Sequence, residues 1–133
     1  MEQLYLANFL DLALELQPLA QKFLSLVNTA IVPSTCRITV TWRSADAQGA
    51  AFDKGLSNAK AGQSPHNCTL DGEPNAKAFD FAIFNPDGSY VTDGEDKRYS
   101  IAGHIAEGLG LIWGATFSKP DYDHVELSNW RNI

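Results

Sequence analysis

A segment near the middle of the chain predicts a β-strand that carries a single carboxylate. Residues 78–84 read Ala-Phe-Asp-Phe-Ala-Ile-Phe, and strand alternation places Phe79, Phe81 and Ile83 on one face and Asp80 on the other. A carboxylate on an otherwise apolar strand is costly unless it is paired or bound to a metal ion. The fold must therefore bring Asp80 to a metal, to a buried arginine or to a turn that it caps. The strand pattern leaves these alternatives open.

The other elements predict one domain, residues 1–133, of the α+β class. Helices come first and strands follow, without a repeating strand-helix-strand unit, which is typical of an antiparallel sheet with helices on one side. Residues 37–42 alternate polar with β-branched and aromatic side chains, as a strand does. From these patterns we expect helices at 2–16, 18–29, 45–55 and 98–109, strands at 37–42, 78–84, 111–114 and 124–127, and a loop at 57–63.

Charge and composition exclude several classes of protein. The formal net charge is −6 with only ten lysines and arginines, so we expect no nucleic-acid partner. Residues 1–31 are rich in leucine, but Glu2 stands where a signal peptide has positive charge, and charged residues interrupt every apolar run. We therefore expect neither a signal peptide nor a membrane span. The spacing of Cys36 and Cys68 predicts no disulfide, and two buried or partly buried thiols are expected.

Two histidines and the strand carboxylate offer a set of metal ligands. His66 precedes Asp80 by fourteen residues, and His124 lies near the C-terminal end of the sequence. A catalytic zinc site takes three protein ligands from His, Asp and Glu and keeps one position for water or substrate. Asp121, three residues before His124, is placed to move a proton without binding the metal. Cys68, two residues after His66, is a less favoured alternative ligand.

Three ordered motifs around these residues resemble a known family. They are Ser-x-His ending at His66, Ala-x-Asp ending at Asp80, and Asp-x-x-His from Asp121 to His124. Upstream, residues 41–44, Gln48, residues 55–57 and residues 62–64 match the same pattern, and Trp113-Gly114 and residues 124–127 match it downstream. In this the chain resembles the zinc peptidases that comprise D-alanyl-D-alanine carboxypeptidases and L-alanyl-D-glutamate endopeptidases, among them many phage endolysins. The resemblance covers residues 37–127, the expected catalytic core, whereas the helical part, 1–31, matches only in character.

The resemblance implies a fold, a cofactor and roles for particular side chains. The fold would be a zinc domain like those of hedgehog proteins and D-alanyl-D-alanine peptidases, with Zn²⁺ bound by His66, Asp80 and His124. Arg43, at the end of a predicted strand, would stabilise the oxyanion, and Asp121 would act as the base. Residues that support the ligands or contact substrate are expected to be Glu126, which shares a strand face with His124, Ser64 and Gln48. Strand alternation predicts that Asp123 points away from His124.

The sequence departs from the family in one place. The first histidine and the aspartate are usually about half as far apart, and residues 67–77 form a longer, polar connection here. Asp71-Gly72 and Pro74-Asn75 are turn formers, which favours a segment that loops out and leaves the metal ligands together.

The function implied by the resemblance is hydrolysis of a peptide bond in the stem of peptidoglycan. The L-alanyl-D-glutamate bond is the favoured target. A D-alanyl-D-alanine carboxypeptidase and a non-catalytic, zinc-stabilised binding module remain open alternatives. We expect a monomeric phage lysis enzyme that collects in the host cytoplasm and acts on the cell wall after release.

Overall fold

A four-stranded antiparallel sheet forms the centre of the molecule. The computed structural model describes residues 7–55, 59–60 and 62–132, and the strand order is β1-β4-β6-β5. The strands are β1 (Thr35–Val40), β4 (Ala78–Phe84), β5 (Leu111–Trp113) and β6 (His124–Leu127), and a separate hairpin joins β2 (Thr69–Leu70) to β3 (Glu73–Pro74). The predicted α+β class and antiparallel sheet are confirmed.

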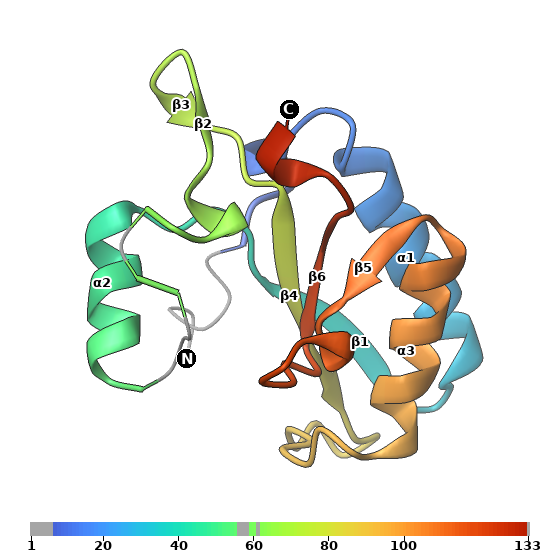
Figure 1. Ribbon diagram of the computed structural model, residues 1–133. Coiled ribbons are helices and arrows are strands. Elements are labelled where there is room, and N and C mark those ends of the chain that lie inside the picture. The colour runs from blue at the N-terminus through green and yellow to red at the C-terminus, as the bar shows by residue number, and fades with distance from the viewer. Residues whose placement is uncertain (1–6, 56–58, 61, 133) are drawn as a thin grey trace.

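Two helices cover one face of this sheet, and a third stands apart from them. Helix α1 (Gln17–Ala30) packs against β1 and against α3 (Lys97–Gly108), which in turn packs against β5. Helix α2 (Ala45–Asp53) lies away from this pair, across the sheet in Figure 1. Short 3₁₀ helices occur at η2 (Phe9–Asp11), η3 (Pro65–Asn67), η4 (Gly114–Thr116) and η5 (Trp130–Asn132). No helix in the described ranges has the length and apolar character that a membrane span requires.

Strand β4 has one face in the hydrophobic core and carries Asp80 on the other. Phe79, Phe81 and Ile83 are fully buried, and the rings of Phe79 and Phe81 each lie 5.2 Å from that of Phe23 on α1. Asp80 leaves the other face of the strand, as the alternation predicted. Aromatic and aliphatic burial of this kind is the main favourable term in folding. The core therefore fixes the face to which Asp80 points.

The predicted first helix is wrong over the residues that the structure describes. Residues 2–6 of that helix lie outside the described ranges. From residue 7 on, the chain makes η2 and then pairs with a distant segment, because Ala13 N–H donates to Ala76 C=O and Ala76 N–H donates to Asp11 C=O. Leu10 and Leu14 are exposed here, whereas an amphipathic helix would bury apolar residues at this spacing. Backbone pairing with Ala76 outweighed the helical periodicity of this segment.

The other predicted elements are confirmed, with ends that shift by a few residues. The strand predicted at 78–84 has those bounds, whereas the strand predicted at 37–42 runs from Thr35 to Val40, so that Arg43 follows it in a loop. Residues 57, 58 and 61 of the predicted loop lie outside the described residues. Cys36 and Cys68 are free thiols, and burial raises the pKa of Cys36 to about 12.

Two glycines on α3 make a matched test of how tightly this helix packs on the sheet. A Cβ added at Gly103 would collide with the indole ring of Trp113 on β5, and one added at Gly108 would meet nothing. We predict that Gly103→Ala lowers the free energy of unfolding by about 1–3 kcal/mol through overpacking. Gly108→Ala should leave it unchanged or raise it by up to about 1 kcal/mol, because alanine favours a helix. Urea unfolding of both variants measures the difference, and equal stabilities would contradict the packing described here.

Candidate metal centre

The pairing of β4 with β6 sets Asp80 directly opposite His124. The two residues are register partners, and Oδ1 of Asp80 lies 3.0 Å from Nδ1 of His124. The same carboxylate oxygen lies 3.1 Å from Nε2 of His66, which comes from η3 outside the sheet. These three ligand atoms all lie within 4.8 Å of one another. The fold thus gathers the three residues that the sequence singled out.

A short capped turn holds His66 in place. Ser64 is the N-cap of η3: its Oγ accepts from His66 N–H at 3.1 Å, and the side chain of Asn67 reaches back to Ser64 N–H. This reciprocal pattern satisfies backbone donors that a helix start leaves free. The backbone of Arg43 is tied to the same turn, because Arg43 N–H donates to His66 C=O at 2.9 Å. In this structure Ser64 shapes the turn beneath the histidine.

Each histidine has a hydrogen-bond acceptor on the ring nitrogen that faces away from Asp80. Nδ1–H of His66 donates to Thr41 C=O at 2.8 Å, and Nε2–H of His124 donates to Glu126 Oε1 at 2.8 Å. Such acceptors fix the tautomer and leave the other nitrogen available to a metal ion. Glu126 therefore occupies the position from which an acceptor holds a metal-ligating histidine in its tautomer.

The electrostatics of the cluster favour positive charge between the three ligand atoms. Burial by itself raises the pKa of Asp80, but the charge of His66 and hydrogen bonds from both histidines hold it well below its usual range. Burial lowers the pKa of His124, but hydrogen bonds to Asp80 and Glu126 and the charges of Asp80 and Asp121 raise it to about 10. A cation placed here would meet the same attraction.

The donor set fits a zinc ion. Two imidazole nitrogens and one carboxylate oxygen are the ligands of many catalytic zinc sites, and tetrahedral donors at about 2.1 Å from an ion are about 3.4 Å apart. The separations of 3.0 and 3.1 Å from Asp80 to the two histidines are close to that value. His66 and His124 are buried and the side chain of Asp80 is 16% exposed. Cys68 is not part of this group of described residues.

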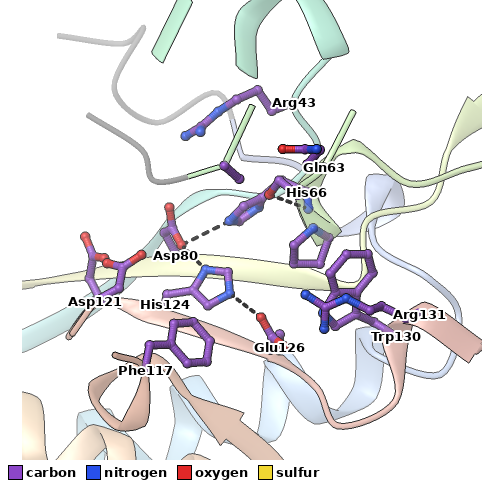
Figure 2. A pocket seen from close by; sticks show the side chains of 14 residues that line it. Arg43, Gln63, His66, Asp80, Phe117, Asp121, His124, Glu126, Trp130 and Arg131 are labelled. Carbon is purple, nitrogen blue, oxygen red and sulfur yellow. Dashed lines mark hydrogen bonds and ion pairs between the residues drawn. The ribbon is translucent and has the colours of Figure 1, made fainter. Parts of the chain in front are cut away.

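The ligand cluster opens into a cavity of about 520 Å³. Figure 2 shows His66, Asp80 and His124 in its middle, with Asp121 on one side of His124 and Arg131 on the other. Arg43 is drawn above the cluster, on the side of His66. Phe117, whose ring lies 5.6 Å from that of His124, adds an apolar wall. The cavity thus combines a candidate metal site with anionic, cationic and apolar parts of its lining.

The prediction that Asp123 points away from the site is wrong. Asp123 lines the same cavity, and its carboxyl makes a hydrogen bond with Asp121. The alternation rule failed because residue 123 lies before β6 begins, in a turn where the strand geometry does not apply. Burial, the charge of Asp80 and the contact with Asp121 raise the pKa of Asp123 to about 9. Asp123 and Asp121 thus lie close enough to share a hydrogen bond at the cavity wall.

The loop that carries Asp121 is held closely against the end of β5. Asp121 N–H donates to Gly114 C=O at 2.9 Å, and Trp113 Nε1–H donates to Tyr122 C=O at 2.7 Å. A Cβ at Gly114 would collide with the carbonyl oxygen of Asp121. Glycine is the residue that allows two backbone segments to approach this closely. The Trp113-Gly114 pair therefore sets the position of the Asp121 backbone.

Gln48 fixes the side chain of Arg43. Gln48 is fully buried on α2; its Oε1 accepts from Arg43 Nη1 at 3.0 Å, and its Nε2 donates to Ala59 C=O at 2.7 Å. This orients the guanidinium of Arg43, which lines the cavity. The sequence suggested that Gln48 contacts substrate or supports the site; in the structure it holds the side chain of Arg43.

Comparison with known proteins identifies the fold. No protein-family model and no curated protein matches the sequence. Among solved structures, the chain is similar to the L-Ala D-Glu endopeptidase ChiX of Serratia marcescens, with a TM-score of 0.62 and 19% sequence identity. The match covers 94% of this chain and 86% of that chain. The likeness establishes the fold.

Several parts of the cavity lining were not apparent from the sequence. Trp130 and Arg131, on η5 after the last strand, line it, and so does Phe117. No motif or alternation marked these residues, because only the folded chain brings the C-terminal segment to this cavity. The role of the Thr41 carbonyl could not be read from the sequence either, because every residue has a backbone carbonyl.

The segment 67–77 loops out, as predicted. Its middle forms the β2–β3 hairpin, which protrudes at the top of Figure 1, with Asp71 and Gly72 at positive φ in the turn. None of its described residues lines the cavity. At the base, Asn75 N–H donates to Cys68 C=O and Lys77 N–H donates to Pro65 C=O. These backbone hydrogen bonds close the base of the insertion, so that it leaves the flanking ligands His66 and Asp80 together.

The acceptor on His124 gives a first prediction for metal binding. Glu126→Ala removes the carboxylate that holds the imidazole, so the affinity for Zn²⁺ should fall by about 10- to 100-fold. Titration against a chromophoric chelator measures the affinity, and metal analysis of wild-type protein should give one zinc per chain. Loss of zinc from His66→Ala and from His124→Ala would identify the ligands.

A second Glu-His pair serves as the control. Glu107 accepts from His104 at 2.9 Å on the exposed face of α3, where the side chain of His104 is 71% exposed. Glu107→Ala should leave zinc affinity unchanged. If both glutamate variants bound zinc as tightly as the wild type, Glu126 would have no part in the metal site.

The hairpin gives a second prediction. Replacing Thr69 to Asn75 by a short turn should leave zinc stoichiometry intact, because the hairpin contributes no ligand to the group formed by His66, Asp80 and His124. Any change should appear in the choice among substrates. Loss of metal from a trimmed protein that keeps its circular dichroism spectrum would show that the segment holds the site together.

Proposed function

We propose that this protein is a zinc-dependent peptidase of bacterial peptidoglycan that hydrolyses the L-alanyl-D-glutamate bond of the stem peptide. The observation that carries the proposal is the convergence of His66, Asp80 and His124, with their tautomers fixed, at the centre of an open cavity. The likeness in fold to an L-Ala D-Glu endopeptidase supports the same assignment.

His66, Asp80 and His124 would hold the ion, and Glu126 and the carbonyl of Thr41 would keep the two imidazoles in their ligating tautomers. Zinc bound there would supply a Lewis acid that polarises the scissile carbonyl and favours ionisation of water. The remaining chemistry belongs to side chains of the chain itself.

Asp121 is the proposed general base. It lines the cavity beside the candidate ligands, and Gly114 and Trp113 hold the loop on which it lies. In this position its carboxylate takes a proton from the attacking water and delivers it to the leaving amine. Asp123, which is hydrogen-bonded to Asp121, would orient its carboxylate.

Arg43 is the proposed oxyanion donor. Its guanidinium lines the cavity on the side of His66, and the hydrogen bond to Gln48 limits its motion. An oriented donor of this kind stabilises the charge that develops on the carbonyl oxygen as water attacks.

The resemblance of the motifs to those of phage endolysins also supports a proposal about where the protein acts. In this view the protein acts on the cell wall after release from the host cytoplasm, as a monomer. The acidic surface, with a net charge of −6, gives no general attraction to anionic wall polymers, so substrate affinity would come from contacts inside the cavity.

Removal of the base tests the mechanism. Asp121→Ala should keep the fold and the zinc but lower the rate of peptide-bond cleavage by roughly a hundredfold or more, the scale for general-base catalysis. Mass spectrometry of digested peptidoglycan measures the rate and identifies the bond that is cut. Asp123→Asn, which keeps a donor to Asp121, should lose much less. Wild-type protein that binds zinc and releases no stem-peptide fragment would contradict the assignment as a peptidase.

A further inference from the structure

The cavity has a cationic corner to which the proposed mechanism gives no task. Arg131 lines the cavity from η5, on the side of His124 opposite to Asp121 (Figure 2). Its guanidinium carbon lies 4.3 Å from the ring centroid of Trp130, which lines the cavity and packs against the hydrophobic core. Stacking on an anchored indole restricts the guanidinium and leaves its N–H donors at the ring's edge available.

This corner presents donors to the cavity and lacks an internal anion. Among the described residues, no carboxylate lies within ion-pair distance of Arg131. Glu126, another acid of the cavity lining, is engaged with His124. An exposed arginine at the cavity wall, stacked on an aromatic ring and without an ion-pair partner among the described residues, is suited to an anionic ligand.

The distribution of charge limits where such a ligand can bind. Asp121 lies on the other side of His124 from Arg131 in Figure 2, so an anionic group of the substrate would be repelled there. Arg43, the second guanidinium of the lining, is the proposed oxyanion donor on the side of His66. A carboxylate on the substrate is therefore attracted to Arg131, away from Asp121.

We propose that Arg131 binds a free carboxylate of the substrate residue next to the scissile bond, so that the enzyme prefers an acidic peptide to its amidated analogue. This rests on the proposed function, because in an L-alanyl-D-glutamyl unit the alanyl side chain is a methyl group. The glutamyl residue alone brings a free carboxylate to the bond. Arg131 is thus a specificity-determining residue, and amidation of that carboxyl group removes the group that it recognises.

Two synthetic peptides test the inference. Both contain the L-alanyl-D-glutamyl bond, and the glutamyl residue carries either a free α-carboxylate or an α-carboxamide. Zinc-loaded wild-type protein should cleave the acid with a kcat/KM roughly ten- to a hundredfold higher than the amide, through a lower KM, as expected for a hydrogen-bonded charge pair. Arg131→Gln should lose this preference by slowing cleavage of the acid. Arg131→Lys, which keeps the charge but not the planar fork, should keep part of it.

Arg37 provides the matched control. It is an exposed arginine that is also stacked on an aromatic ring, with its guanidinium carbon 5.2 Å from the centroid of Phe84, and it does not line the cavity. Arg37→Gln should retain the wild-type preference for the acid. Equal kcat/KM values of wild-type protein on the two peptides, or an undiminished preference in Arg131→Gln, would overturn the inference while the peptidase assignment stands.

A binding measurement separates the inference from the proposed function. Calorimetry of the two peptides with Asp121→Ala requires no turnover, and the acid should bind roughly tenfold or more tightly than the amide. Introducing Arg131→Gln into this variant should abolish the difference. If wild-type protein cleaved neither peptide, the peptidase assignment would fail. The binding measurement would still decide the role of Arg131, because equal affinities for the two peptides would refute it.

Discussion

The antiparallel pairing of β4 with β6 is the interaction on which the candidate metal centre depends. It places Asp80 opposite His124 and Ala78 opposite Glu126, so one ligand, its partner and the acceptor behind that partner share one face of two adjacent strands. Cross-strand neighbours have Cβ atoms about 4.5–5.5 Å apart, which is the range in which two short side chains can share a cation. A shift of one residue in register would send His124 and Glu126 to the opposite face.

The hydrophobic core secures that register. Phe79 and Phe81 alternate with Asp80 and pack against Phe23 of α1, while Val125 alternates with His124 and Glu126 and is fully buried. Any slip that displaced the ligands would also expose these side chains to water, at a cost of about 1.5–3 kcal/mol for each large apolar residue. The apolar face therefore stabilises the site on the other side of these strands. There the carboxylate of Asp80, two imidazoles and Glu126 meet, an arrangement that is unfavourable by itself.

The remaining groups of the cavity come from loops and short helices that pack around this pair of strands. η3 supplies His66, the turn after β1 supplies Arg43, the loop after η4 supplies Asp121, and η5 supplies Arg131. Each is fixed by local bonds to its neighbours: the Ser64 cap, the Gln48 side chain, the Gly114 backbone and the Trp130 ring. A rigid sheet with function on the attached loops is a common division of roles in proteins.

The sequence by itself determined the α+β class, most of the elements and three of the residues that converge, because these depend on local periodicity and on motifs of a few residues. Asp80 was identifiable because a carboxylate on an apolar strand needs a partner. Tertiary structure decided the rest. The segment before α1 exchanged its helical pattern for pairing with Ala76, Asp123 turned into the cavity from a turn outside β6, and Trp130 and Arg131 reached it from the C-terminal segment. Such placements depend on contacts between residues far apart in the chain, and no local pattern records them.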